Sequence, residues 1–214
     1  FSEDAAAWLY PLSKNGGLDI KIANLYIGGC TLEMHWNNVL SKKEEYIYQQ
    51  NGNSEGRRCS IQEALDSEEW DFVVMQQASY LSGEPETYYP YLLELSAYVK
   101  KKQPQAIPLI HQTWAYETNS THDGFSRYSG SQSVMYTRLK AAYAEASKRT
   151  GFALIPCGNV IQELRRYPDF DILRGGRSLC RDGYHLDFLY GRYAAAAVWY
   201  ETILNSDIRK NAYL

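Results

Sequence analysis

Positions 70–79 read Trp-Asp-Phe-Val-Val-Met-Gln-Gln-Ala-Ser, and this stretch decides the expected fold. Its apolar centre lacks polar alternation and ends abruptly at two amides, Gln76 and Gln77. Such a run is typical of a strand that is buried on both faces of a parallel sheet. The polar end indicates that the strand opens into a site. We therefore expect a site at the carboxyl ends of parallel strands.

The patterns on either side of this stretch alternate between strands and helices. Further strands are predicted over residues 18–27, 107–114 and 151–156. A polar stretch over residues 42–58, with a turn at 51–53, predicts a surface hairpin. Helices are predicted over residues 2–12, 31–40, 60–65, 89–102, 133–150 and 159–166, and from Asp182 through Leu204.

This alternation predicts an α/β protein, a single three-layer α/β/α domain over residues 1–214 with a mostly parallel sheet. The composition agrees, because 45% hydrophobic and 22% charged residues are ordinary for a globular chain of this length. A net charge of −3 without a dense Lys/Arg cluster argues against nucleic acid or an anionic membrane as the main partner. No apolar run reaches the length of a membrane span. The four cysteines show no zinc-type spacing.

The segment Arg181-Asp182-Gly183-Tyr184-His185-Leu186 carries the clearest chemical signal. Asp182 and His185 are three residues apart at the expected start of the last helix, so both side chains can point into one cleft. A carboxylate there can hold one ring nitrogen and leave the other free to take a proton from a serine hydroxyl. In isolation the same spacing also fits a helix cap beside a surface histidine.

Three stretches point toward one rim of the expected sheet, namely residues 28–31, 76–79 and 182–185. Together they resemble the SGNH (GDSL-type) hydrolase superfamily, whose fold is flavodoxin-like. Phrases at residues 24–33, 70–79, 113–116 and 181–186 resemble more narrowly a bacterial SGNH-like family, and the resemblance covers nearly the whole chain.

The resemblance implies a role for each matching residue. His185 would be the general base, Asp182 its orienting partner, and Gly29 a backbone N–H donor to the oxyanion. Gln77, or failing that Gln76, would replace the asparagine that many SGNH enzymes use. Glycines before a helix also serve tight turns, so Gly28 and Gly29 can share the two tasks.

The nucleophile is where this sequence departs from the family pattern. Members carry Gly-Asn-Ser-Phe-Ser after the first strand, with the serine before the phenylalanine as nucleophile, and this sequence begins at Phe1. The resemblance therefore places the nucleophile just before Phe1. Ser2 matches the second serine, which is a helix-capping position in the family, and it is the substitute nucleophile to test.

The first family strand would also precede Phe1. It would be central in a sheet of order 2-1-3-4-5, between the strand ending at Ile27 and the one ending at Met75. We expect the printed chain to be a truncated form with little or no esterase activity. We also expect its gap to be collapsed, or filled by a strand from another chain in a homo-oligomer, because unpaired backbone groups seek partners.

The sequence thus predicts a serine esterase, most plausibly a carbohydrate O-acetyl esterase, that needs no metal or organic cofactor. A glycan ester would bind near Trp114, Tyr116 and His122, in a chain with 19 Tyr and 5 Trp. His35 and His122 are expected to be structural or to contact substrate. A periplasmic or secreted location is preferred to a cytoplasmic one. Two alternatives stay open: a non-catalytic carbohydrate-binding or scaffold protein, and a lipase or thioesterase.

Overall fold

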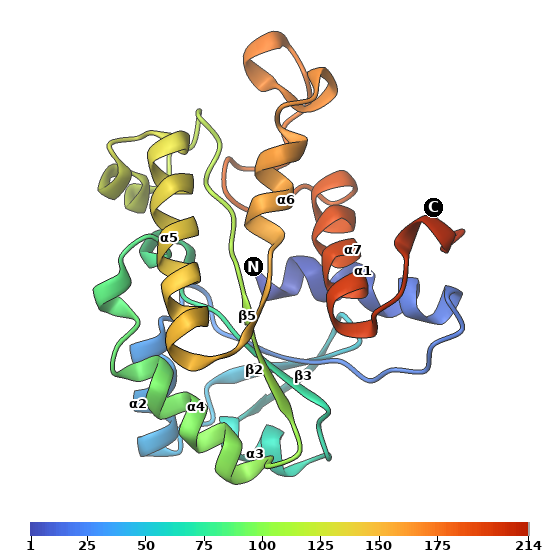
Figure 1. Cartoon of the computed structure of the whole chain (residues 1–214). Helices are drawn as coiled ribbons and strands as arrows, with labels where there is room; N and C mark the ends of the chain where they lie inside the picture. Colours follow the sequence, from blue (N-terminus) through green and yellow to red (C-terminus); the bar gives the residue numbers. More distant parts are fainter. Residues whose placement is uncertain (214) are drawn as a thin grey trace.

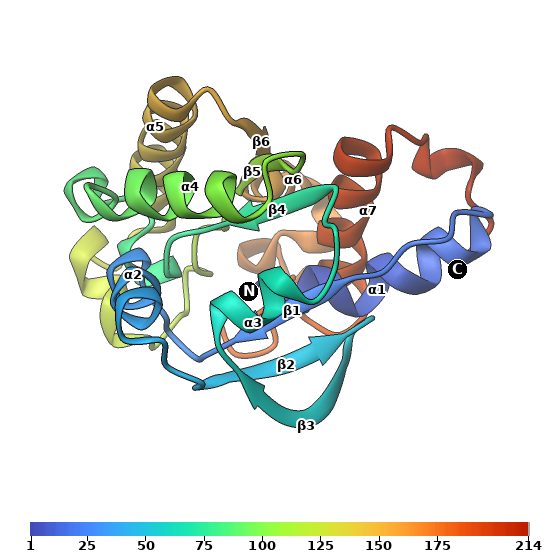
Figure 2. The ribbon, with the colours of Figure 1, turned by 90° about the horizontal axis from the view of Figure 1, so that it is seen from below.

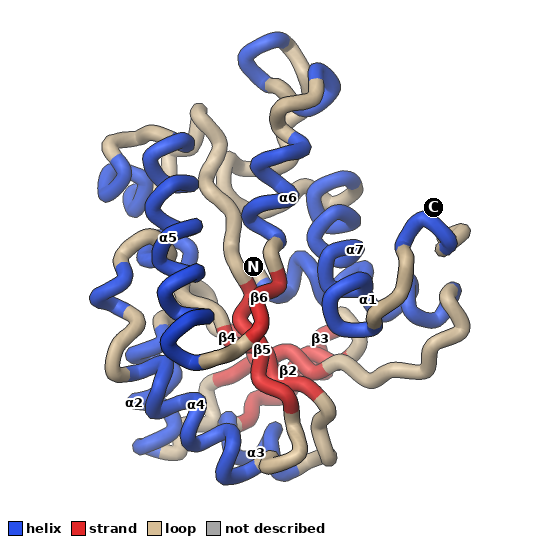
Figure 3. The backbone as a smooth tube through the Cα atoms, viewed as in Figure 1, coloured by secondary structure: helices blue, strands red, loops and turns tan. Residues whose placement is uncertain are grey.

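The computed structural model describes residues 1–213, and its centre is a parallel sheet. The strands β4 (Phe72–Met75), β5 (Ile107–His111) and β6 (Ala153–Ile155) lie side by side in that order. Phe72 is opposite Ile107 and Leu109 is opposite Ala153 in parallel register. The parallel sheet predicted from residues 70–79 is confirmed by this register, and its strands are red in Figure 3.

Helices cover both faces of this sheet, which makes three layers (Figure 1). Adjacent residues of β5 point to opposite faces, since Leu109 packs in one buried cluster and Ile110 in another. A strand covered on both faces has no polar side, which explains the unbroken apolar run of β4. The first face carries α1 (Ser2–Asn15), α6 (Cys157–Leu164) and α7 (Tyr190–Leu204), and the second carries α2 (Leu32–Ser41), α4 (Tyr91–Lys102) and α5 (Gln132–Thr150).

The predicted hairpin forms a second, antiparallel sheet with the upstream strand (Figure 2). Its strands are β1 (Ala23–Tyr26), β2 (Tyr46–Gln50) and β3 (Asn53–Cys59), in that order. The strand expected over residues 18–27 is therefore shorter than predicted. It was also expected to join the parallel sheet, whereas its recorded pairing is antiparallel to β2, with Asn24 opposite Gln49. The hairpin supplies this partner, which the apolar pattern of residues 18–27 could not reveal.

Local signals placed several helix starts correctly. The hydroxyl of Thr31 accepts the Met34 N–H at 3.1 Å at the start of α2. The hydroxyl of Ser60 accepts the Glu63 N–H, also at 3.1 Å, at the start of α3 (Ile61–Asp66). Both are ordinary N-caps, because a side-chain oxygen satisfies a free N–H of the first turn.

Two other helix starts differ from the prediction. The N-cap of α1 is Phe1, and the Ser2 hydroxyl instead donates to Asn24 Oδ1 at 2.7 Å. The last helix begins at Tyr190 rather than at Asp182. The carboxylate of Asp187 accepts N–H groups of residues 189–191, so it performs the capping that the alternative interpretation gave to Asp182.

The short 3-10 turns lie in the connections. They are η1 (Ser79–Leu81), η2 (Pro85–Thr87), η3 (Asp123–Tyr128), η4 (Pro168–Phe170), η5 (Ile172–Arg174) and η6 (Ile208–Lys210). Across the described residues, no helix combines the length and the apolar character needed to cross a membrane.

Candidate active site

A tight loop presents the Asp182 and His185 side chains together. Cys180 and Leu186 form an antiparallel bridge across the base of the loop, and the Arg181 N–H donates to the His185 carbonyl at 2.9 Å. Between them Gly183 has φ +87°, and a Cβ there would lie 2.9 Å from the Ser120 backbone. Only glycine fits this position without strain. The loop therefore fixes the two side chains three residues apart without help from a helix.

The predicted carboxylate–imidazole hydrogen bond is confirmed. Asp182 Oδ2 lies 2.7 Å from His185 Nδ1, while Asp182 Oδ1 accepts the N–H groups of Tyr184 and His185. Partial burial would raise the pKa of Asp182, but these hydrogen bonds from His185 and Tyr184 outweigh it and lower the pKa. An ionised Asp182 keeps the hydrogen of a neutral His185 on Nδ1, which leaves Nε2 free to accept a proton.

Buried polar contacts from distant segments hold this loop. The carboxylate of Asp4 in α1 is almost fully buried and accepts the Leu186 N–H at 3.2 Å. It also pairs with Arg181 at 3.2 Å and Arg192 at 2.8 Å. On the other side of the loop, the indole N–H of Trp114 donates to the Tyr184 carbonyl at 2.7 Å. The position of the Asp182–His185 pair is therefore set by the packing of the whole first face.

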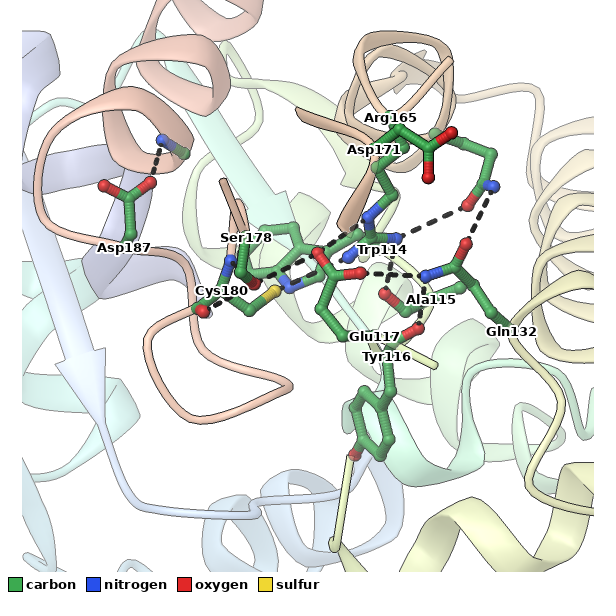
Figure 4. Close-up of polar contacts among 12 residues, drawn as sticks. Trp114, Ala115, Tyr116, Glu117, Gln132, Arg165, Asp171, Ser178, Cys180 and Asp187 are labelled. Carbon is green, nitrogen blue, oxygen red and sulfur yellow. Dashed lines mark hydrogen bonds and ion pairs between the residues drawn. The ribbon is translucent and has the colours of Figure 1, made fainter. Parts of the chain in front are cut away.

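A buried ion pair between Glu117 and Arg165 supports the same loop from behind (Figure 4). Glu117 Oε1 accepts from Arg165 Nε at 3.0 Å, and the Glu117 N–H donates to the Gly183 carbonyl at 2.8 Å. Other groups complete the network, with Glu117 also accepting from Gln132 and Ser178, and Arg165 donating to Ala115 and Cys180. Both oxygens of the Glu117 carboxylate accept hydrogen bonds, so this pair serves to hold the loop in place.

Gly29 lies on the wall of the same cleft, where the loop after β1 leads into α2. Its φ of +64° is a left-handed conformation, and a Cβ there would meet nothing within 4 Å. The glycine is thus required by the backbone turn rather than by crowding. Gly29 is exposed on this wall.

The two glutamines after β4 have opposite surroundings. Gln77 is fully buried, and its amide oxygen accepts the Leu32 N–H at 3.0 Å while its Nε2 donates to Thr87. Gln76 lines the cleft, and its Oε1 has no partner among the described residues. The preference for Gln77 as oxyanion donor is therefore wrong in geometry, because its amide is already used in the core. Gln76 is the amide that faces the site.

Of the three residues expected to contact substrate, two are buried and one lines the cleft. Trp114 and Tyr116 are both 0% exposed, so the expectation that they touch substrate is incorrect. Instead, Trp114 stacks on Phe1 at 4.4 Å between ring centroids, and Tyr116 shares a hydrogen bond with the Ser79 hydroxyl. His122 does line the cleft. The segment after β5 runs inward, and no local pattern in residues 112–116 signals that direction.

A row of rings that the sequence did not single out replaces them. Tyr80 and Tyr184 line the cleft, with ring centroids 6.3 and 4.7 Å from that of His122. The Gly124 N–H donates to His122 Nδ1 at 3.0 Å, so the neutral ring carries its hydrogen on Nε2. Burial lowers the pKa of His122, which favours this neutral form. The rim next to His185 thus offers flat rings and a hydrogen-bond donor.

The His185 ring lies beside the amino end of the chain, with its centroid 5.7 Å from that of Phe1. Among the described residues, no serine hydroxyl is hydrogen-bonded to His185, and the Ser2 hydroxyl is held by Asn24. His35 Nδ1 lies 2.8 Å from the Tyr46 hydroxyl, and His35 also lines the cleft. Nowhere in residues 1–213 do three or more His, Cys, Asp or Glu side chains gather as a metal site.

The cleft at His185 and the groove between β1 and β4 form one continuous cavity of about 1070 Å³. The groove lies where the resemblance places a central strand, and it is open. The expected collapse of this gap is therefore not observed. Its walls are largely apolar along the strands. Polar residues lie at both ends, with His122, Asp123 and His185 at one and Lys21, Glu68 and Asp71 at the other.

Comparisons with known proteins agree with this fold. A crystal structure from Bacteroides uniformis ATCC 8492, of a DUF4886 family protein, is similar with 37% identity and a TM-score of 0.92, over 100% of this chain and 83% of that one. A proposed SGNH hydrolase from Slackia heliotrinireducens shares the fold with 24% identity and a TM-score of 0.59, over 94% of both chains. A search of curated proteins gave no match.

Residues 1–214 match the family described as Domain of unknown function (DUF4886). The structural likeness to the Slackia protein gives this family an SGNH-type α/β fold, as the sequence resemblance implied. The chain belongs to the DUF4886 family and has the SGNH hydrolase fold.

Proposed function

We propose that this protein is a serine esterase of the SGNH type that removes small acyl groups, with acetyl esters of carbohydrates as the substrate class. The observation that carries the proposal is the 2.7 Å hydrogen bond between Asp182 and His185 at the mouth of the cleft. This pair orients the imidazole and leaves Nε2 without a hydrogen-bond partner among the described residues. The SGNH-type fold supports the same reaction class at the level of hydrolases.

The reaction needs a serine within reach of His185 Nε2, and we place it immediately before Phe1. Its oxygen attacks the ester carbonyl carbon while Nε2 takes the hydroxyl proton. The carbonyl oxygen becomes an oxyanion, to which the Gly29 N–H and the Gln76 amide donate. The intermediate expels the alcohol, which takes the proton from Nε2. Water, deprotonated by Nε2, then releases the acid from the acyl-serine.

The polar rim supports a carbohydrate alcohol. Tyr80 and Tyr184 offer ring faces on which a sugar can stack, and His122 Nε2–H can donate to a sugar hydroxyl. Asp123 and Arg127 line the same rim and add polar partners. A small acyl group needs little room beside Gly29, whereas the alcohol can spread along the rim.

The apolar groove favours a second candidate, a lipase or thioesterase with a long acyl chain. Its walls include Leu25 and Val74, and it opens directly at His185. Acyl chain length therefore distinguishes the two candidates.

Three chains test the proposal. They are the 214-residue chain, the same chain extended upstream of Phe1 by an apolar strand ending in Gly-Asn-Ser, and a matched extension ending in Gly-Asn-Ala. We expect only the serine-bearing chain to hydrolyse an aryl acetate, and to prefer acetyl to octanoyl esters. Preference for octanoyl would select the lipase candidate. Equal turnover by all three chains would contradict the upstream serine and make Ser2 the nucleophile. No turnover on any ester would contradict the esterase itself.

A further inference from the structure

A second pocket lies outside the cleft, on the segment that follows α6. Its volume of about 430 Å³ is within the roughly 300–1,000 Å³ of small-molecule sites. In Figure 1 the segment is the orange loop that projects beyond α6. Residues 168–170 and 174–177 line the pocket together with Tyr190, the first residue of α7. None of these residues lines the cleft at His185.

The backbone around this pocket is held in one compact conformation. The Arg177 N–H donates to the Asp169 carbonyl at 2.7 Å, which closes the segment on itself. Gly175 has φ +84°, and a Cβ at Gly176 would collide with the Pro168 carbonyl oxygen. Both positions therefore require glycine, the first for its left-handed backbone and the second for the close approach of two chain segments. The pocket is thus preformed by its own loop.

Two aromatic rings and a guanidinium without an acidic partner line the pocket. The rings of Phe170 and Tyr190 meet edge to face, with their centroids 5.6 Å apart. The guanidinium carbon of Arg177 lies 5.4 Å from the centroid of the Tyr190 ring. Among residues 1–213, Arg174 has an ion-pair partner in Asp171 at 3.2 Å, whereas Arg177 has none. Arg177 therefore keeps N–H donors for an anion beside a flat ring.

The pocket is joined to the loop that carries the candidate catalytic pair. The chain leaves the pocket at Arg177 and returns to it at Tyr190, so the catalytic loop lies between two pocket residues. Arg177 Nη1 donates to the Tyr190 hydroxyl oxygen at 3.5 Å, which brings these two ends together. Next to Arg177, the Ser178 hydroxyl donates to Glu117 Oε1 at 3.3 Å, and Glu117 also supports the catalytic loop through the Gly183 carbonyl. The two sites therefore share one support.

The side chains in the pocket match a sugar that carries a carboxylate. A guanidinium can donate two parallel N–H bonds to a carboxylate, and the ring of Tyr190 can stack on a sugar face. The carboxylate of Asp169, which also lines the pocket, can accept hydrogen bonds from sugar hydroxyls. An inorganic anion would gain nothing from the rings and would be repelled by Asp169. A neutral sugar would leave the donors of Arg177 unused.

We propose that this pocket binds one carboxylate-bearing sugar residue of an acidic polysaccharide. Binding itself requires neither a nucleophile nor hydrolysis. The inference deepens the proposed function and rests on it in one respect, which is that the acetyl ester is then carried by the same acidic glycan. The rim with Tyr80 and Tyr184 remains the place for the esterified sugar, and the pocket holds another residue of the glycan chain.

An NMR titration of the 214-residue chain tests the pocket without hydrolysis. The probes are a galacturonic acid trisaccharide, its carboxyl-reduced form, which is a neutral galactose trisaccharide, and inorganic phosphate. Arg177→Gln removes the guanidinium, and Tyr190→Ala removes the ring. Arg166→Gln and Phe188→Ala are the matched controls, because both residues are exposed but neither lines the pocket.

We expect the acidic trisaccharide alone to shift the amide resonances of residues 168–177. Each pocket variant should raise its Kd by about tenfold or more, while both controls keep the parent Kd. Thermal melts of the four variants should match the parent, since the changed side chains are exposed.

Three results would overturn the proposal in different ways. Equal binding of the reduced trisaccharide would contradict the carboxylate, and equal losses in the controls would contradict the pocket. Phosphate that shifts the same resonances and displaces the trisaccharide would make this a site for free anions. The absence of binding by every probe would overturn the proposal outright. An esterase failure leaves all these readouts unchanged, so the two proposals fail separately.

Discussion

The Glu117–Arg165 pair and the Asp182–His185 pair lie next to the same loop, but they differ in solvent exposure. The buried pair supports the loop, whereas the half-exposed pair is the candidate catalytic pair. Glu117 and Arg165 have side chains 2% and 5% exposed, whereas those of Asp182 and His185 are 38% and 34% exposed. The buried pair uses its hydrogen-bonding atoms on fixed partners (Figure 4). The half-exposed pair keeps one ring nitrogen free. In this protein the candidate reactive group is His185, because it lines the cleft and keeps one hydrogen-bonding atom unused.

The largest expected effect comes from breaking the half-exposed Asp182–His185 pair. In the serine-bearing extended chain, His185→Ala should lower kcat for an aryl acetate by roughly 10⁴-fold or more, because the proton acceptor is lost. Tm should change little, since the ring lies at the rim. Steady-state kinetics and thermal melts measure both.

Asp182→Asn is the companion variant. It keeps the shape of the loop but weakens the hold on Nδ1, so turnover should fall substantially while the fold persists. If both variants kept the parent kcat, the pair would be ordinary surface residues and the comparison would fail.

Breaking the buried Glu117–Arg165 pair should lower the free energy of unfolding instead. Arg165→Met leaves the Glu117 carboxylate buried without its main partner, which typically costs about 3–5 kcal/mol of unfolding free energy. Urea unfolding measures this loss. The double variant Glu117→Leu/Arg165→Met should recover part of it, because no isolated charge remains. A single-variant loss below about 0.5 kcal/mol would contradict the supporting role.

Gln76 and Gln77 allow the same comparison between a residue at the cleft and a residue in the core. Gln76→Ala should lower kcat by about 100- to 1,000-fold, which is typical for one oxyanion donor. Gln77→Ala is the matched control, and it should lower Tm because its amide bonds Leu32 and Thr87 in the core. Reversed outcomes, with kcat depending on Gln77, would reinstate the residue preferred from sequence.

The smallest effect is a pH dependence from His35, which is partly buried. Burial lowers the pKa of His35 from 6.5 to about 4. The unfolded chain therefore takes up the proton first as pH falls. The stability contributed by neutral His35 is complete above pH 6.5 and is lost as pH falls toward 4. Tm should decline through this window, and less steeply in His35→Gln. Equal slopes in both chains would show that His35 is not the titrating group.

The sequence predicted elements whose signals are local. The apolar run at residues 72–75 and the helix starts at residues 31 and 60 depend on neighbours along the chain, and all three match the structure to within one residue. The Asp182–His185 hydrogen bond was predictable for the same reason, because a three-residue spacing already limits the distance.

What could not be predicted depends on contacts far along the chain. A strand covered on both faces has no alternating pattern, so nothing in residues 72–77 could tell which glutamine turns outward. Trp114 and Tyr116 look like cleft aromatics by type, and only the packing of the helices shows them as core. Asp4 gave the signal of a first-turn acid, which does not reveal that its partners lie in the last quarter of the chain.

The long-range contacts of Asp4 mean that the site can form only late in folding. Its contacts to Arg181, Leu186 and Arg192 span 177, 182 and 188 residues of sequence. Contacts of such separation form only after the intervening chain has been ordered, since closing long loops costs entropy before any contact compensates. The loop that carries His185 should therefore become rigid among the last steps of folding. During refolding, capture of Nε2 by an active-site reagent would then report the arrival of the complete domain, later than helix formation does.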